Sequence, residues 1–194
     1  MPRKPRVEVP HGFHHVVAKG NAGQDIVTDD TDRRRLLERM GRAVEKHRWS
    51  CLAYCLLDNH LHVVVQTPEP NLGMGMKWLK ASYAQDFNHR HERHGHLFGG
   101  RFYSKLVQWD EHLISSIVYV ALNPVRAGIA RSPESWPWSS YAPTIGSAPA
   151  PAFLDTEHVL ALFDSDRAVA RLRLREAVEE GWARDRDRGQ TRGV

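Results

Sequence analysis

The apolar residues of this chain recur at two spacings, which predict different elements. Runs rich in β-branched residues, bounded by glycine, proline or polar residues, predict four strands: residues 10–19, 49–57, 60–67 and 102–109. Apolar residues three and four positions apart predict three helices: residues 30–47, 72–90 and 110–123. The third helix is expected to end at Asn123, because Pro124 disfavours helical geometry in the residue before it.

The order of these elements is β-α-β-β-α-β followed by a further helix. This order predicts an α+β chain with the ferredoxin-like arrangement, a four-stranded antiparallel sheet with two helices on one face. Asp58 and Asn59 give a tight-turn signal that joins the second and third strands as a hairpin. A fold of this kind hosts many functions, so the activity has to be inferred from particular residues.

The C-terminal quarter has a different composition from the rest of the chain. Residues 131–153 contain five prolines and the aromatic run WPWSSY, which predicts an ordered extended segment. Residues 155–182 have the pattern of one or two short helices, and the charged tail from residue 184 is expected to fray. We therefore divide the chain into a domain over residues 1–145 and a partly helical extension over residues 146–194.

Composition narrows the class of protein only slightly. The 194 residues carry a net charge of +4, which is compatible with a polyanionic partner. No stretch reaches the roughly 18 apolar residues of a membrane span, and the basic N-terminus has no apolar signal region. Cys51 and Cys55 would lie about 13 Å apart in a strand, too far for a disulfide, so we expect reduced thiols in a cytoplasmic protein.

Two histidines stand at the start of the third strand, in DNHLHVVV at residues 58–65. Strand side chains alternate between faces, so His60 and His62 point the same way, with Cα atoms about 7 Å apart. Two neutral imidazoles at this distance can bind one divalent metal ion, although a complete site needs another ligand. The alternative is two half-exposed histidines at a hairpin edge.

A tyrosine and an asparagine share one face of the third helix, in IVYVALNPVRAG at residues 117–128. Tyr119 and Asn123 are four residues apart, so a helix packed on the sheet could aim both at a strand. A tyrosine can attack a phosphodiester that a metal ion polarises. The alternative is a core tyrosine and an asparagine that only ends the helix. Tyr83 is a rival nucleophile, but its place on an apolar stripe favours core packing.

Several stretches, taken together, resemble one protein family. DNHLHVVV resembles the His-hydrophobic-His motif of single-tyrosine (HUH) transposases of the IS200-like superfamily. YVALNPVRAG resembles the helix of the REP-associated tyrosine transposases, in which a tyrosine precedes Asn-Pro by four residues. Three further stretches match that branch in order: GFHHVVAKGN, SYAQDFNHRHERHGHLFGGRFYSKLV and SPESWPWSSY. The resemblance covers roughly residues 10–145.

The resemblance implies a function and a set of roles. The protein would be a metal-dependent endonuclease and strand transferase that nicks and rejoins single-stranded DNA beside REP-like hairpins through a 5′-phosphotyrosine. Tyr119 would be the nucleophile, with His60, His62 and Asn123 as metal ligands. The metal would be Mg²⁺ or Mn²⁺, because an asparagine ligand favours a harder ion than the zinc that histidines alone would allow. We expect a cytoplasmic, nucleoid-associated monomer that does not bind membranes.

Basic residues near the middle of the chain are candidate phosphate ligands. The run HRHERHGH and the strand after it contain four cations that could bind DNA: Arg90, Arg93, Arg101 and Lys105. The alternative is a solvated charge run. Arg3, Lys4 and Arg6 form a second basic cluster that could reach a DNA groove.

Two other functions are compatible with this fold. A catalytically inactive protein that binds DNA hairpins would not need the intact His60, His62, Tyr119 and Asn123. An RNA-binding module would show aromatic residues on its central strands. Here the central hairpin carries histidines and aliphatic residues instead, which favours the enzyme.

Overall fold

The computed structural model describes residues 8–108 and 110–190. Its N-terminal part forms six elements in the expected order: β1 (Gly12–Lys19), α1 (Asp30–His47), β2 (Ser50–Leu56), β3 (His60–Thr67), α2 (Leu72–Arg90) and β4 (Tyr103–Val107). The basic cluster at Arg3, Lys4 and Arg6 lies outside the described residues, as does Trp109 at the expected end of β4.

The four strands form one sheet in the order β2-β3-β1-β4, and every neighbouring pair is antiparallel. This is the ferredoxin-like sheet, so the predicted fold class is confirmed. Because β1 is central, Val17 has two partners, His62 on β3 and Tyr103 on β4. This register brings side chains from three strands to one region of a single face.

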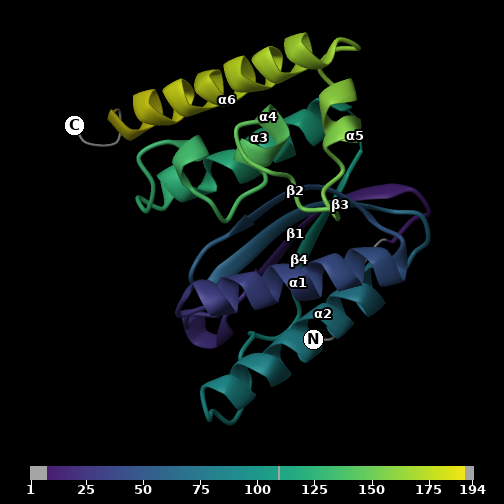
Figure 1. Ribbon diagram of the computed structural model, residues 1–194, viewed down its shortest axis with the longest axis vertical. Helices are drawn as coiled ribbons and strands as arrows, with labels where there is room; N and C mark the ends of the chain where they lie inside the picture. Colours follow the sequence, from purple (N-terminus) through teal and green to yellow (C-terminus); the bar gives the residue numbers. More distant parts are fainter. Residues whose placement is uncertain (1–7, 109, 191–194) are drawn as a thin grey trace.

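The two faces of the sheet carry different layers (Figure 1). Helices α1 and α2 cover one face, where they bury Val16, Leu61 and Val63 together with the apolar stripes of both helices. The opposite face is covered by α3 (Asp110–Arg126), α4 (Tyr141–Ile145), α5 (Thr156–Ala161) and α6 (Arg167–Gln190). Val64 and Val107 belong to this second core, so His60 and His62 face α3, because alternate residues of a strand share a face.

Helix α3 does not end before its proline, so the expected boundary at Asn123 was wrong. The helix continues through Pro124 to Arg126. Pro124 has no backbone N–H to donate, but it lies near the C-terminal end of α3. There Ala127 donates to the Asn123 carbonyl at 2.9 Å and closes the final turn. The Tyr119 carbonyl accepts hydrogen bonds from two side chains, Asn123 Nδ2 at 2.8 Å and Arg126 Nη1 at 3.3 Å. These bonds from the side chains stabilise the last turns.

Residues 131–153 are ordered but were wrongly expected to be extended throughout, because a 3-10 helix (Pro133–Ser135) precedes a short extended part that meets β2 at Ser139. Leu56 donates to the Trp138 carbonyl at 2.9 Å, and Ser140 donates to the Tyr54 carbonyl at 2.9 Å. The segment therefore pairs with the outer edge of β2 and protects an edge strand that would otherwise be open. The pattern did not reveal the short helix α4, which begins directly after this pairing at Tyr141.

Helix α6 is longer than the sequence indicated. It begins where the second of two short helices was expected, and it continues to Gln190. The prediction of a frayed tail was therefore wrong for residues 184–190. Its buried residues Ala170, Leu174 and Val178 are spaced for one face. Gly181 continues that face, and a Cβ there would lie 2.9 Å from Leu122 Cδ1 of α3. Close packing on α3 thus supports residues that look unstructured in the sequence.

Both cysteines are free and buried, as expected from their spacing. Burial raises the pKa of the Cys51 thiol to about 12, so it is inert at neutral pH. Among the helices of the described residues, none is long and apolar enough to cross a membrane.

Two buried histidines make the stability of the fold sensitive to acid. Burial lowers the pKa of His14 and of His47, and the Nε2 atom of each is buried without a hydrogen-bond partner among the described residues. Below about pH 6.5 both histidines bind a proton more readily in the unfolded chain than in the folded protein. The free energy of unfolding therefore has its full value above that pH and falls as the pH is lowered.

We therefore expect urea denaturation to show lower stability at pH 5.5 than at pH 7.5. In His14→Leu this dependence should weaken by up to about 1.4 kcal/mol per pH unit, because one titrating group is removed. Replacing the exposed His94 in the same way serves as the control. Equal pH dependence in wild type and His14→Leu would contradict the assignment.

Candidate active site

Three histidines and a tyrosine meet between the sheet and α3. His60 and His62 come from β3, and His15 comes from the same face of the neighbouring β1. The ring centroids of His60 and His62 are 4.9 Å apart, and those of His15 and His62 are 5.4 Å apart. Tyr119 of α3 completes the cluster, with its ring centroid 5.5 Å from that of His15 and 5.8 Å from that of His62.

Hydrogen bonds occupy one nitrogen of each β3 histidine. His60 Nδ1 donates to Asn59 Oδ1 at 2.6 Å, so the Nε2 of a neutral His60 carries a lone pair. His62 Nδ1 lies 3.1 Å from His15 Nε2, and one of these two atoms donates to the other. When His62 donates, its Nε2 also carries a free lone pair. Asn59 and His15 are therefore placed to present two Nε2 atoms as ligands, as hydrogen-bond partners of metal-binding histidines commonly do.

The environment keeps these imidazoles uncharged. Burial is the main cause that lowers the pKa of His62 to about 3, with smaller effects from His60, His15 and Lys19. Burial also lowers the pKa of His60, as does Lys19, and it lowers that of His15, as does Lys105. Neutral imidazole is the form that binds metal ions, so the cluster is ready for a cation at neutral pH.

The residues present fit a divalent ion that takes further ligands from its substrate. Among the described residues, no three His, Cys, Asp or Glu side chains form a group that could hold a metal. Asn123 is not one of these four residue types, but the oxygen of its neutral amide can also bind a metal ion. It is buried, and its Nδ2 donates to the Tyr119 carbonyl, which leaves Oδ1 as the atom that could bind a cation. Two neutral imidazoles leave the ion's charge uncompensated, which suits a phosphodiester ligand.

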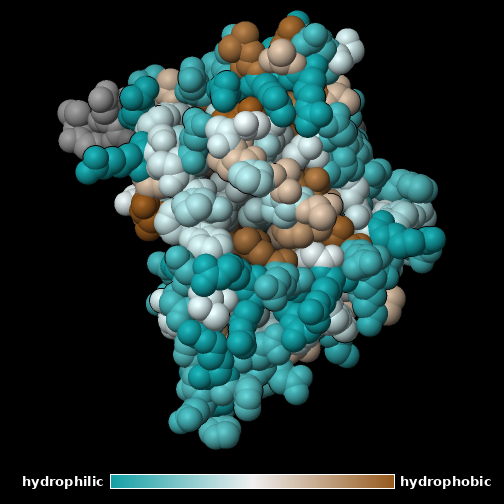
Figure 2. All heavy atoms as spheres, viewed as in Figure 1, coloured by the Kyte–Doolittle hydropathy of each residue, from teal (hydrophilic) through white to brown (hydrophobic). Residues whose placement is uncertain are grey.

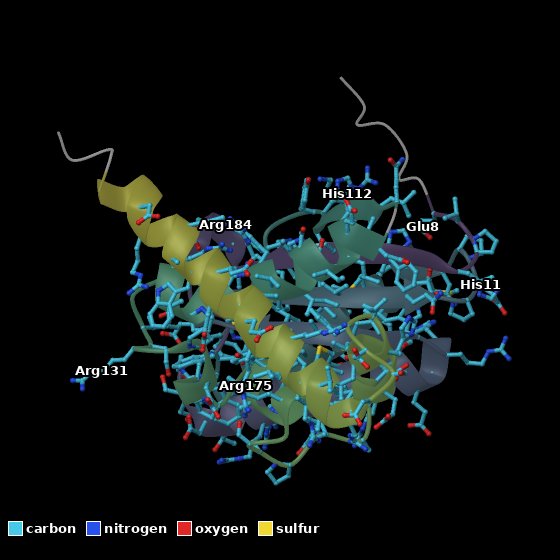
Figure 3. The ribbon with its side chains drawn as sticks, turned by 90° about the horizontal axis from the view of Figure 1, so that it is seen from above. Glu8, His11, His112, Arg131, Arg175 and Arg184 are labelled. Atoms are coloured by element: carbon cyan, nitrogen blue, oxygen red, sulfur yellow. The ribbon has the colours of Figure 1, made fainter. Side chains whose placement is uncertain are left out.

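Tyr119 is accessible and is held by an arginine from its own helix. Its side chain is 42% exposed, and the guanidinium carbon of Arg126 lies 4.6 Å from the ring centroid. Asp185 of α6 binds that guanidinium through Oδ2, at 2.7 Å from Nε and 2.6 Å from Nη2. Figure 3 shows α6 lying across α3. The C-terminal helix therefore reaches the site through one ion pair.

Tyr119 lines two hollows. One, of about 270 Å³, is lined by His15, Lys105 and His112 together with Tyr119. The other, of about 340 Å³, lies between α3 and α6 and includes Arg126 and Arg184. The first contains Lys105 and no carboxylate, so it suits a phosphate-bearing strand, whereas the second also contains Glu180 and Asp185.

The rival tyrosine lies in the opposite layer. Tyr83 is fully buried, and its hydroxyl donates to the Ile26 carbonyl at 2.6 Å. Burial also raises its pKa. Packed against Phe87 and Phe98 in the core beneath α2, this tyrosine has a structural role.

The four candidate phosphate ligands separate into two pairs. Arg90 is bound to Asp29 and Asp32 at 2.5 Å each, and Arg93 donates to Gln24 at 2.7 Å, so both are engaged within the chain. Both extend from the end of α2, on the side of the sheet away from α3. Lys105 instead pairs with His15 across β1 and β4 and is exposed, as is Arg101 just before β4. Lys105 lies on the histidine face beside His15, and Arg101 lines both a hollow at Val17 and another beside α2.

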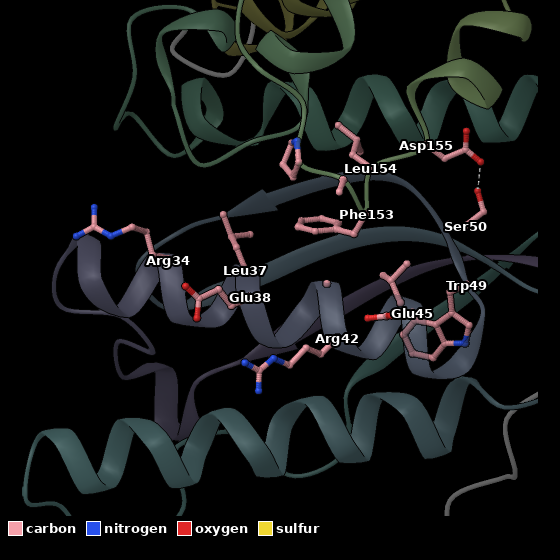
Figure 4. A pocket seen from close by; sticks show the side chains of 14 residues that line it. Arg34, Leu37, Glu38, Arg42, Glu45, Trp49, Ser50, Phe153, Leu154 and Asp155 are labelled. Carbon is pink, nitrogen blue, oxygen red and sulfur yellow. Dashed lines mark hydrogen bonds between the residues drawn. The ribbon is translucent and has the colours of Figure 1, made fainter.

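The largest of the described cavities lies elsewhere. It has a volume of about 1020 Å³ and lies between α1 and residues 151–155, on the far side of the sheet from His62 (Figure 4). Its apolar wall includes Phe153 and Leu37, and Figure 2 shows an apolar patch on this face of the molecule. Arginine and glutamate side chains share its rim, so its charge selects no ligand class.

Sequence reasoning missed three residues of this site: His15, Arg126 and Asp185. The alternation of β1 could have found His15, because Phe13, His15 and Val17 share a face. No sequence signal indicated Asp185, since its role depends on a helix that the charged tail did not predict.

Comparison with known proteins places the chain in a family. The family model described as "Transposase IS200 like" matches residues 9–121, and the chain belongs to this family. The match includes His15, His60, His62 and Tyr119, and it ends before Asn123 and the C-terminal helices.

One curated relative is a putative REP-associated tyrosine transposase of Haemophilus influenzae. It is 26% identical over an alignment of 108 positions that covers 50% of this chain and 61% of that protein, so the chain spans less than two thirds of the relative's length.

Solved structures support the fold. A REP-associated tyrosine transposase bound to a REP hairpin aligns with a TM-score of 0.65 and 18% identity, over 80% of this chain and 94% of that chain. A tRNA(His) guanylyltransferase from Saccharomyces cerevisiae aligns with a TM-score of only 0.40 and 11% identity, over 91% of this chain and 82% of that chain. This TM-score is too low to indicate a shared fold.

Proposed function

We propose that this protein is a transposase that cuts and rejoins single-stranded DNA through a covalent 5′-phosphotyrosine. One observation carries the proposal: an accessible tyrosine, Tyr119, lies against two neutral histidines, His15 and His62, whose ring centroids are 5.5 Å and 5.8 Å from its own. Family membership supports the same reaction class.

The bonds that form and break belong only to Tyr119 and the DNA. The Tyr119 oxygen attacks the phosphorus of a phosphodiester and loses its proton, while the 3′-oxygen of the DNA leaves and takes up a proton. A 3′-hydroxyl from the same or another strand reverses the step and releases Tyr119. The bond energy is kept in the phosphotyrosine, so no nucleotide cofactor is needed.

We propose that His60, His62 and Asn123 hold the divalent ion, Mg²⁺ or Mn²⁺. When bound, the ion would polarise the scissile phosphate and orient it. The chain's own part is to keep both imidazoles neutral, to engage each Nδ1, and to place Tyr119 over the same face of the sheet. Arg126, above the ring, holds the phenol in position.

The substrate we propose is single-stranded DNA beside a REP-like hairpin. The solved relative is described as bound to a REP hairpin, which supports this choice. Arg101 and Lys105 are the phosphate ligands we propose, because Arg90 and Arg93 are already paired within the chain. We further propose that the enzyme acts as a cytoplasmic, nucleoid-associated monomer. We propose residues 1–145 as its nuclease domain and residues 146–194 as an extension that braces α3.

The test is detection of the covalent intermediate. Purified protein is mixed with labelled single-stranded hairpin oligonucleotides and Mg²⁺ or Mn²⁺, and the products are separated on a denaturing gel. A slow band that needs metal and disappears on protease treatment supports the proposal. Hairpin binding without any such band, across a broad hairpin library, would replace it with the inactive hairpin-binding protein.

His15 should tune metal affinity without binding the ion. In His15→Leu, His62 Nδ1 loses its partner, so we expect Mn²⁺ to bind about 10- to 100-fold more weakly, the usual cost of removing a hydrogen-bond partner of a metal ligand. Titration followed by the paramagnetic resonance of free Mn²⁺ measures this without DNA. His14→Leu, on the opposite face of β1, is the matched control, and equal weakening in both variants would contradict the role.

A further inference from the structure

An unusually exposed tyrosine lies beside the histidine cluster. Tyr103, on the edge strand β4, is 61% exposed. It pairs with Val17, and Val17 pairs with His62, so Tyr103 and His62 flank Val17 on the same face of the sheet. Two strand spacings separate them, which is about 10 Å. The ring is therefore about one nucleotide step from a phosphate that would be held at His62.

The surroundings of Tyr103 form a small basic hollow. It has a volume of about 220 Å³ and is lined by Val17, Lys19, Gly99, Gly100, Arg101 and Tyr103. Lys19 lies directly opposite His60 in the β1–β3 pair and is exposed, so its charge lies between the hollow and the histidines. No acidic residue is among the described residues that line the hollow.

The floor of the hollow is shaped by glycine. The Gly99 N–H donates to the Lys19 carbonyl at 3.0 Å, which joins the loop before β4 to the end of β1. A Cβ built at Gly100 meets no atom within 4 Å, so that position faces open space. Neither glycine therefore adds a side chain over the Tyr103 ring, and the exposure of this tyrosine leaves room for a planar group to approach it.

An exposed aromatic ring on an edge strand needs an explanation, because open apolar edges promote aggregation. A ring flanked by Lys19 and Arg101, with Lys105 two residues along the same face, is the combination that binds single-stranded nucleic acid. Bases stack on the ring while cations bind the phosphates on either side. An apolar protein partner would not be favoured by a rim with cations and no acids.

We infer that Tyr103 is a stacking platform for one base of the DNA strand close to the cleaved phosphodiester, and that Lys19 and Arg101 bind the phosphates next to that base. The inference depends on the proposed function at one point only, the identity of the phosphodiester that is cleaved. The binding site itself requires neither the metal nor Tyr119.

The first experiment measures binding without chemistry. Fluorescence anisotropy follows a labelled hairpin flanked by single-stranded thymidine tracts, in EDTA, with the full chain. Loss of one stacked base typically costs 1–3 kcal/mol, so we expect Tyr103→Ala to weaken binding about 5- to 150-fold, and Tyr103→Phe to bind like wild type. Leu172→Ala, which removes a 55% exposed side chain from α6, is the control. Wild-type binding by Tyr103→Ala would overturn the inference.

The second experiment locates the base. Abasic sites are placed one at a time along the thymidine tracts, and wild type is compared with Tyr103→Ala on each oligonucleotide. At one position, near the cleavage site, the abasic DNA should bind both proteins equally, because the stacked base is already missing. An equal loss in Tyr103→Ala at every abasic position would mean a general effect of the substitution and would overturn the platform.

The cations have a separate readout. Lys19→Gln should make the salt dependence of binding shallower by about 0.7 in log–log slope, the value for one phosphate contact on a single strand. An unchanged slope would remove Lys19 from the site. If wild type forms no covalent adduct but Tyr103 still acts at a single base, the proposed reaction fails and the platform remains.

Discussion

Phenylalanine at position 119 is expected to abolish the covalent protein–DNA band while leaving hairpin binding intact. The substitution removes only the attacking oxygen and keeps the ring that lies against His15 and His62 and beneath Arg126. Loss of the nucleophile should lower cleavage on the order of a thousandfold or more. Denaturing gels measure the adduct, and anisotropy in the same buffer measures binding.

The matched control is the same substitution at Tyr83. Its hydroxyl is buried and donates to the Ile26 carbonyl at 2.6 Å, so Tyr83→Phe should keep the adduct and lose about 1–3 kcal/mol of stability instead. An adduct that survives in Tyr119→Phe and disappears in a folded Tyr83→Phe would place the nucleophile on α2 and refute the site described here.

The sheet and its first two helices could be predicted because their signals are local. Strand alternation, the turn at Asp58 and Asn59, and the apolar stripes of α1 and α2 all agree with the observed fold. The face shared by His60 and His62 follows from the same alternation. Each of these inferences needs only the period of one element.

Features that depend on contacts between distant elements could not be predicted. Helix α3 continues through Pro124 to Arg126 while its buried face packs against β2 and α6, contacts that the sequence of α3 alone does not reveal. Helix α6 is long because its close approach at Gly181 packs it on α3. Alternation along β1 gives the face of His15, but its position beside His62 also depends on the β1–β3 register, which a single strand does not specify.

Loss of the Arg126 guanidinium is expected to lower cleavage about 100-fold with little change in DNA affinity. The guanidinium carbon lies 4.6 Å from the centre of the Tyr119 ring, so its charge acts on the phenol whose oxygen loses a proton and attacks the phosphorus. Removing one such electrostatic contact typically costs 100- to 1,000-fold in rate. Single-turnover cleavage at saturating protein separates this effect from binding, because it measures the chemical step alone.

Comparison of variants distinguishes the charge of Arg126 from its geometry. Arg126→Lys keeps the charge and loses the planar fork that binds Asp185, so it should recover only part of the rate. Asp185→Asn keeps Arg126 but weakens the ion pair that positions it, so we expect a smaller loss, about 10-fold. Arg131→Ala, at an exposed side chain that points away from the molecule in Figure 3, is the control. If Asp185→Asn cleaves DNA at the wild-type rate while Arg126→Ala does not, Arg126 acts on its own and α6 has no part in the reaction.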